Sequence, residues 1–286
     1  MQYAITGITG TVGGEVARNL LATGRSVRAV LRDREKAGSW ADRGCDVALA
    51  SLEDVAALTR AFTGSESAFI LLPANFDPAP GFTEVKTLVS AVRAALEASR
   101  PARVVCISTI GAQATTENLL SQLAVMEQAF GELPMPIAFL RPAWFIENAR
   151  WDVASARENG TIQSFLQPLD KRFPMVATAD IASVAARLLQ ETWTGRRIVE
   201  LEGPARVSPN DIAAAFSRLL GKPVRAEVVA RETWEGLFRA QGMTNPTPRM
   251  RMLDGFNEGW LEFEAGLAGS VKGTTPLDAT LKTLLV

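Results

Sequence analysis

Short apolar runs alternate with amphipathic segments along the first half of the chain. The runs predict strands at residues 2–6, 27–31, 45–49, 67–72, 103–108 and 137–140. Between them, apolar residues recur every three or four positions, which predicts helices at residues 12–22, 53–62, 81–99 and 116–130. Strands that alternate with helices in this way build a parallel sheet covered on both faces, so the sequence predicts a doubly wound α/β fold.

The alternation weakens after Pro142. Helices are predicted at residues 144–158, 178–191, 209–221, 231–241 and 248–264, and strands at residues 197–201 and 224–229. Residues 197–201 are expected to rejoin the main sheet. The sequence therefore predicts a main domain of residues 1–145, to which about residues 174–203 return. Residues 146–173 and 204–286 are predicted to form a smaller C-terminal α+β lobe.

Three glycines, Gly7, Gly10 and Gly13, separate the first strand from the first helix. The first can turn sharply, the second lets a pyrophosphate approach bare backbone, and the third lets the helix pack closely on the strand. Free N–H groups at the helix start would face the phosphates. The pattern predicts a Rossmann-type NAD(P)-binding domain, the alternative being a glycine-rich turn of another α/β protein. The predicted pyrophosphate contacts are Thr6, Gly7, Thr9, Gly10, Thr11, Val12 and Gly13.

The residues after the second predicted strand bear on the choice of nucleotide. The side chain there contacts the adenosine ribose. An acid accepts a hydrogen bond from the 2′-hydroxyl, whereas an arginine binds a 2′-phosphate. Arg32 holds the strand-end position, and Lys36 follows one helical turn later. Asp33 supports the alternative, NAD, whereas Arg34 is expected to be a solvated loop charge. A guanidinium can bind phosphate with two hydrogen bonds, so the sequence favours NADP (NADPH) over NAD.

Composition narrows the possible partners. The chain has 286 residues and a net charge of −1, with Lys and Arg scattered, so no nucleic-acid partner is expected. No apolar run approaches the ~20 residues needed to cross a bilayer, and no signal peptide is recognised. Cys45 and Cys106 are expected to be buried free thiols rather than a disulfide or a nucleophilic pair. We expect a cytoplasmic monomer or homodimer that acts on a small molecule, without a metal or a membrane partner.

Several stretches resemble the NmrA-like family of atypical short-chain dehydrogenases. They are TGITGTVGG, VLRD, VVCISTIGAQ, LRPAWFIEN, ELEGP and GTTPLDATL, and they run nearly end to end. The resemblance implies a Rossmann domain with a small C-terminal substrate lobe. It also implies either an NADP-dependent reductase of quinones, dyes or related compounds, or a non-catalytic redox-sensing regulator, and it leaves both possibilities open.

The resemblance implies further contacts at the carboxyl ends of the strands. Ser51 and Leu52 replace the Asp-Leu that the family usually has beside the adenine, a departure from its pattern. The path from the ribose to the nicotinamide would pass Leu72, Pro73, Ala74, Ser108, Thr109 and Pro142. Ligands of such sheets bind outside the strand ends. For Ser108 the alternative is a hydroxyl that satisfies the backbone at the end of its strand.

Acid–base catalysis is where the sequence departs most from short-chain dehydrogenases. It contains no histidine, and its one tyrosine, Tyr3, lies within the first strand. No lysine occurs between Lys86 and Lys171, and Gln122 and Leu123 occupy the positions where relatives often carry one. A Tyr/Lys proton relay is therefore excluded by composition, and no catalytic residue is assigned.

Hydride transfer to a quinone-like acceptor does not require a side-chain acid, because the cofactor supplies the hydride. Aromatic residues after the sixth strand could stack on such an acceptor, although packing between helices is an equal alternative. The predicted substrate contacts are Phe76, Thr109, Trp144, Phe145, Asn148, Trp151 and Phe238. Two functions remain: an NADPH-dependent reductase of quinone-like or other conjugated acceptors, and an NADP-sensing regulator without turnover.

Overall fold

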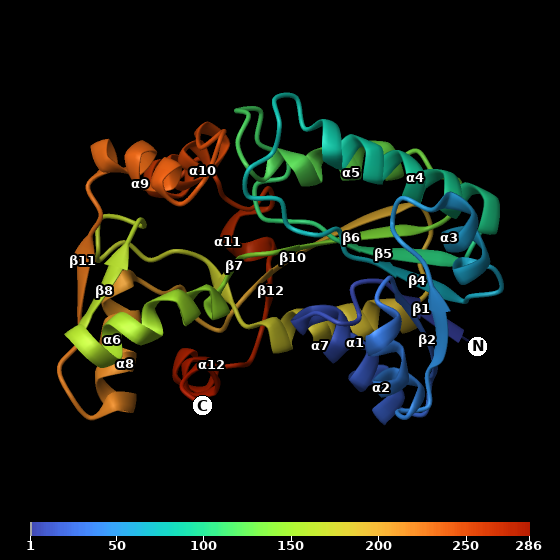
Figure 1. Ribbon diagram of the computed structural model, residues 1–286, viewed down its shortest axis with the longest axis horizontal. Coiled ribbons are helices and arrows are strands. Elements are labelled where there is room, and N and C mark those ends of the chain that lie inside the picture. The colour runs from blue at the N-terminus through green and yellow to red at the C-terminus, as the bar shows by residue number, and fades with distance from the viewer. Residues whose placement is uncertain (1) are drawn as a thin grey trace.

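The computed structural model describes residues 2–286, with a parallel sheet at its centre. Its strands are β1 (Gln2–Ile5), β2 (Ser26–Leu31), β3 (Asp46–Leu49), β4 (Ser67–Ile70), β5 (Arg103–Ile107), β6 (Ile137–Pro142), β10 (Arg196–Glu202) and β12 (Val271–Lys272). They lie in the order β12-β10-β6-β5-β4-β1-β2-β3 (Figure 1). The chain therefore starts in the middle and winds outward in both directions, so a crevice is expected between β1 and β4, where the winding reverses.

Helices cover both faces of this sheet (Figure 1). On one face lie α1 (Thr11–Ala22), α2 (Ala37–Ala41) and α7 (Thr178–Gln190), and on the other α3 (Val55–Phe62), α4 (Thr83–Ser99) and α5 (Ser121–Phe130). Successive strand side chains point to opposite faces. In β1, Tyr3 and Ile5 enter the core under α1 and α7, whereas Ala4 enters the core under α3 and α4. The near-continuous apolar strands of the sequence follow from this double burial.

The remaining elements gather at the other end of the molecule (Figure 1). A small parallel sheet pairs β8 (Thr161–Ser164) with β11 (Arg225–Val228), and β7 (Trp144–Phe145) pairs with β9 (Met175–Val176). The helices are α6 (Val153–Asn159), α8 (Pro209–Leu220), α9 (Trp234–Ala240), α10 (Thr247–Glu258), α11 (Gly266–Gly269) and α12 (Leu277–Leu284). One core continues from Val16 and Leu20 of α1 to Phe216 and Trp234 of this end.

The predicted doubly wound α/β fold is confirmed, with its early strands and helices in the predicted order. Residues 197–201 rejoin the sheet as part of β10, which pairs in parallel with β6. Ser208 and Asp211 form a reciprocal capping box at the start of α8, and Gly221 ends that helix at φ +68°. The strand β12 was not predicted, because two residues carry no pattern.

Three predicted helices were wrong in extent. Residues 144–158 do not form one helix: β7 comes first, then a 3₁₀ helix (Ile146–Asp152), and only then α6. Pairing with β9 holds Trp144 extended. The helix predicted at 116–130 begins only at Ser121, because the Asn118 side chain accepts a hydrogen bond from Leu120 N and forms a turn. The helix predicted at 248–264 spans Thr247–Glu258 and ends at Gly259.

The junction between the 3₁₀ helix and α6 carries a desolvated acid. Burial raises the pKa of Asp152 to about 7. Because this value lies above that of the unfolded chain, the folded state binds the proton more tightly, and stability falls as the pH rises through this window. We expect Asp152→Asn to stabilise the protein by about 2 kcal/mol at about pH 8, and to have little effect at about pH 4. Urea unfolding at both pH values, with exposed Asp42→Asn as control, measures this; a pH-independent difference would contradict it.

The two cysteines are free and buried, as predicted. Burial raises the pKa of both thiols, which disfavours the reactive thiolate. Across residues 2–286, the helices are too short or too polar to cross a bilayer. A shallow cavity lies beside Ile137 and Arg196, at the amino ends of β6 and β10, and thus at the opposite edge from the crevice.

Candidate functional site

A tight turn joins β1 to α1 at the edge of the crevice. Gly7 adopts a φ of +63°, a conformation that side chains disfavour, and its carbonyl accepts a hydrogen bond from Gly10 N at 3.0 Å. A Cβ on Gly13 would lie 2.4 Å from Gly7 O and 2.7 Å from Gly7 C. The start of the helix therefore touches the backbone of the turn directly, which only glycine permits.

The start of α1 has the features of an anion site. No side chain caps it and its first turn carries no acid, among the residues the structure describes. Thr9, Gly10 and Thr11 are exposed there, while Val12 is buried. The first N–H groups of a helix lack intrahelical partners and attract phosphate. The turn and helix start therefore fit the pyrophosphate of a dinucleotide.

Replacing Gly13 with Ala tests this packing. The added methyl group meets backbone rather than a flexible side chain, so the helix start must move. We expect a loss of about 1–3 kcal/mol in the free energy of unfolding and a weaker affinity for NADPH. Urea unfolding and calorimetric titration measure the two effects. Gly38→Ala is the matched control, because a Cβ there meets nothing within 4 Å; equal behaviour of the two variants would contradict the close approach.

Thr6 links β1 to β4, the two strands on either side of the crevice. Its hydroxyl donates to Phe69 O at 3.0 Å and accepts from Leu71 N at 3.0 Å, and the residue is buried. The hydroxyl is therefore engaged in linking β1 to the end of β4, and contact between Thr6 and the pyrophosphate stays a prediction. Beyond β4, Leu72 is buried, whereas Pro73 and Ala74 are exposed along the edge.

The end of β2 presents an exposed cationic side chain, Arg32. The neighbouring Asp33 is turned away into its own loop, where its carboxylate accepts from Glu35 N at 3.0 Å and lies 3.7 Å from Lys36 Nζ. Leu31 pairs with Leu49 of β3, so Ser51 and Leu52 follow at the same edge. Arg32 is thus an exposed charge at the strand end that is open to a ligand, whereas Asp33 is held by its own loop.

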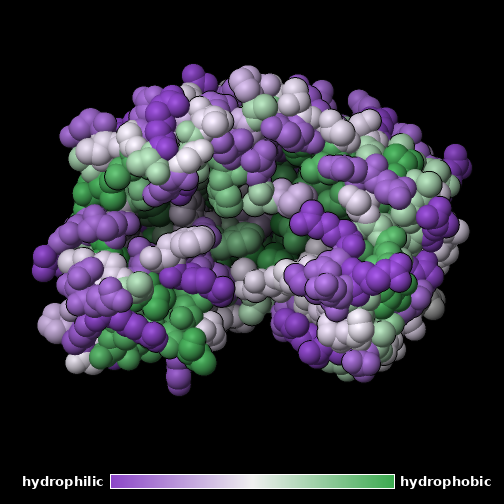
Figure 2. Space-filling view, in the orientation of Figure 1, coloured by the Kyte–Doolittle hydropathy of each residue, from purple (hydrophilic) through white to green (hydrophobic). Residues whose placement is uncertain are grey.

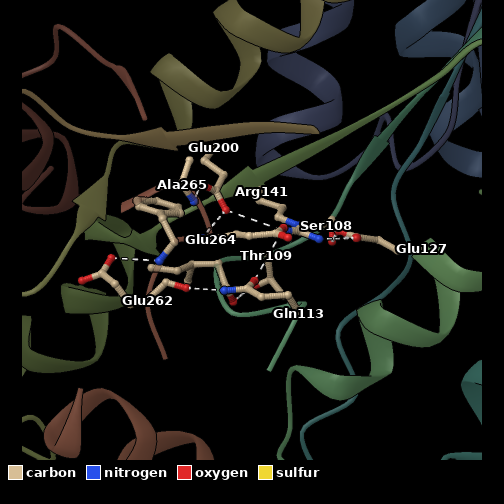
Figure 3. Close-up of polar contacts among 11 residues, drawn as sticks. Ser108, Thr109, Gln113, Glu127, Arg141, Glu200, Glu262, Glu264 and Ala265 are labelled. Atoms are coloured by element: carbon tan, nitrogen blue, oxygen red, sulfur yellow. Dashed lines mark hydrogen bonds and ion pairs between the residues drawn. The ribbon is translucent and has the colours of Figure 1, made fainter. Parts of the chain in front are cut away.

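A buried ionic network lies behind the ends of β5 and β6 (Figure 3). The Ser108 hydroxyl donates to Glu127 Oε1 at 2.5 Å, and Arg141 donates to both oxygens of Glu127 at 2.8 and 2.7 Å. Ser108 therefore binds a carboxylate rather than the backbone, unlike the alternative considered from the sequence. Thr109 instead donates to Ile110 O at 3.1 Å.

Arg141 is surrounded by further carboxylates. Its Nη1 donates to Glu264 at 2.8 Å and lies 3.5 Å from Glu200, whose oxygens accept from Glu264 N and Ala265 N. Burial lowers the pKa of the guanidinium, but the bonds to Glu127 and Glu264 outweigh this and hold the pKa above its usual value. The cation is permanently charged, and it ties β6 to α5, to β10 and to the segment before α11.

Comparison with known proteins identifies the family of this chain. A sequence model described as the NmrA-like family matches residues 2–256. The chain belongs to this family. An NAD(P)H azoreductase of Xenophilus azovorans is 27% identical to it over 240 residues, which are 84% of this chain and 81% of that protein.

Two solved structures share the fold of this NmrA-like chain, each covering 100% of both chains with a TM-score of 0.82. One is the NADPH-dependent quinone oxidoreductase QOR2 of Escherichia coli complexed with NADPH, at 23% identity. The other is the triphenylmethane reductase of Citrobacter sp. complexed with NADP(H), at 22% identity. The fold is therefore that of Rossmann-type reductases.

On the face of the molecule shown in Figure 2, a central recess has a floor of hydrophobic residues. It lies over the part of the molecule where β7 and β10 are drawn in Figure 1. Pro142 is buried at the end of β6, and Trp144 packs edge-on against Phe256 at 5.3 Å between ring centroids. Phe145 is half-buried beside it. These residues lie between the strand ends and the C-terminal elements.

The other predicted substrate residues are spread more widely. Phe238, predicted as a substrate contact, is fully buried and stacks on Phe165 at 5.3 Å, so its side chain packs in the core rather than lining an open pocket. Trp151 is 87% exposed on the 3₁₀ helix and Asn148 is also exposed, so neither lines an enclosed pocket. Phe76 is 56% exposed in the loop after β4.

Sequence reasoning missed Glu127 and Arg141, which hold Ser108 in place. The sequence did contain a sign of the buried Arg141, because this charged residue directly follows the apolar residues 137–140 of a predicted strand. Glu127 lies between Met126 and Phe130 on a helix, where a buried acid is rare without a partner. Tyr3 is buried in β1, so it cannot serve as a proton donor at the strand ends.

Proposed function

We propose that this chain is an NADPH-dependent reductase that transfers hydride to a quinone-like or other conjugated small molecule. The observation that carries the proposal is the glycine turn, whose close packing leaves the uncapped start of α1 open at the crevice. The relatives of this family include an NAD(P)H azoreductase and a quinone oxidoreductase. The acceptor would lie between the main domain and the lobe of residues 146–173 and 204–286, and the active species would be a monomer or homodimer.

The nucleotide would run along the carboxyl edge of the sheet. Gly7, Gly10 and Gly13 would cradle the pyrophosphate, and Arg32, supported by Lys36, would bind the 2′-phosphate. The adenine would lie beside Ser51 and Leu52, and the ribose of the nicotinamide beside Leu72 and Pro73. Arg32 is exposed at the strand end while Asp33 is held by its own loop, which supports NADP over NAD.

Bound NADPH supplies the hydride, and the protein binds and orients the two reactants. Glu127 and Arg141 would fix Ser108 at the end of β5, where the nicotinamide is expected, with Thr109 and Pro142 beside it. The chain contains no histidine, and its single tyrosine is buried. A quinone that accepts hydride becomes a phenolate anion, which can take its proton from water. The proposed reaction therefore needs no Tyr/Lys pair.

Nucleotide binding and turnover separate this proposal from its alternative, a non-catalytic NADP(H) sensor. Calorimetric titration with NADPH and NADH measures binding, and loss of NADPH absorbance with a panel of quinones and azo dyes measures turnover. Turnover with NADPH supports the reductase. Tight NADPH binding without turnover of the panel would favour the sensor, and no binding of either nucleotide would overturn both.

A further inference from the structure

Arg249 lies in the first turn of α10 with its guanidinium against aromatic rings. The guanidinium carbon is 4.3 Å from the centroid of the Phe238 ring and 6.0 Å from that of Phe76. The residue is half-buried, and burial lowers its pKa. A cation held over aromatic faces is stabilised by the ring quadrupoles, and its N–H edge stays available for hydrogen bonds.

Among the residues that the structure describes, this guanidinium has no acidic partner. Other shielded arginines, Arg103, Arg141 and Arg206, each form an ion pair with a glutamate. Within residues 2–286, no carboxylate lies within 4.0 Å of Arg249, and its one hydrogen bond is a long contact of 3.9 Å to Met243 Sδ. A desolvated cation without a counter-ion is costly, and an anion placed beside it removes that cost.

The acid closest in the chain to Phe76 is already engaged. Asp77 accepts from Thr244 N, Thr244 Oγ1 and Asn245 N at 2.9, 2.9 and 2.7 Å. These bonds hold the pKa of Asp77 below its usual range. Asp77 therefore links the loop after β4 to the segment before α10 through hydrogen bonds. Its carboxylate does not form an ion pair with Arg249.

The same contacts fix Arg249 at the edge of the site. Asn245 donates to Pro78 O at 2.8 Å, and Leu119 N donates to Pro248 O at 2.9 Å. The start of α10 is thus tied to the segments that follow β4 and β5, and these segments contain Pro73 and Ser108. Phe76, which is 56% exposed, and Arg249 therefore lie together where the loop after β4 meets the start of α10.

We propose that Arg249 binds an anionic group, a carboxylate or sulfonate, carried by the flat acceptor. This inference rests on the proposed function and names its substrate class as anionic aromatic or quinonoid compounds. A planar guanidinium offers paired N–H groups that match the two oxygens of such an anion. Phe76 supplies a ring on which the flat body of the acceptor stacks.

Paired acceptors test the proposal. The kcat/KM values of Arg249→Met and of the wild-type protein are measured with 1,4-naphthoquinone and with its 2-sulfonate. In Arg249→Met, kcat/KM should fall about 10- to 100-fold more with the sulfonate than with the neutral quinone, mainly through a higher KM, because a hydrogen bond to a charged group is lost. Arg249→Lys should retain part of the preference, and Arg251→Met, on the same helix and exposed, is the control for net charge. Equal losses with both acceptors would overturn the proposal.

Binding separates failure of this inference from failure of the proposed function. Naphthalene-2-sulfonate and naphthalene are titrated against the NADPH-loaded protein and followed by tryptophan fluorescence. If no quinone is reduced but the sulfonate binds and Arg249→Met weakens it at least about 10-fold, the anion site stands and the reductase does not. If the protein binds both compounds with the same affinity, the proposed anion site is wrong. It is also wrong if Arg249→Met weakens the affinity for NADPH as much as the affinity for the sulfonate.

Discussion

Replacing Arg141 with Met should lower the free energy of unfolding by about 3–5 kcal/mol, because it leaves buried carboxylates without their counter-ion. The Arg141 side chain is 4% exposed, and those of Glu127 and Glu200 are 11% and 4% exposed. Met fills a similar volume, so the expected loss comes from the uncompensated charge and from the hydrogen bonds to Glu127, Glu264 and Gln113.

Urea unfolding at neutral pH measures this loss. Arg218→Met is the matched control, since Arg218 binds Asp278 with two hydrogen bonds but both side chains are exposed, at 59% and 44%. An exposed pair contributes about 0–1 kcal/mol, so the control should change little. Adding Glu127→Gln to Arg141→Met should restore part of the stability by removing one buried charge. If Arg141→Met costs no more than Arg218→Met, the network is not a buried ionic one.

The first βαβ unit could be predicted because its rules are local. Residues 2–31 contain an apolar strand, three spaced glycines and an amphipathic helix, each readable within a few positions. The structure places Gly13 against Gly7 O, as expected from that spacing. The cap of α8 was equally readable, since Ser208 and Asp211 bind each other's backbone within one turn.

Residues that depend on distant partners could not be predicted in the same way. Glu127 on α5 and Arg141 on β6 are 14 positions apart and meet only through tertiary packing, and Arg141 reaches Glu264 across 123 positions. Trp144 follows a helical pattern but pairs with Met175 in a strand, so tertiary contacts override its local preference. Phe238 was predicted as a substrate contact because aromatic rings serve both cores and pockets, and only its packing against Phe165 shows that the ring belongs to the core.

Charge reversal at Arg32 should change the choice of nucleotide. Arg32→Glu removes the cation proposed for the 2′-phosphate and places a carboxylate there, which repels phosphate and can accept the 2′-hydroxyl of NADH. We expect the ratio of NADPH to NADH affinity to fall by about 100-fold or more, since a charge-assisted pair is lost and a repulsive one is gained. The fold should be unaffected, because Arg32 is exposed.

Calorimetric titration of both nucleotides measures this ratio, and Arg34→Glu is the matched control. Arg34 is exposed two positions later in the 3₁₀ helix Arg34–Lys36, so the same change of net charge there should alter the ratio by no more than a few-fold through long-range electrostatics. If Arg32→Glu leaves the ratio unchanged, the 2′-phosphate is bound elsewhere. If Arg34→Glu lowers it equally, the selectivity arises from the summed charge of the loop rather than from a contact of Arg32, and the open side chain at the end of β2 is not the determinant.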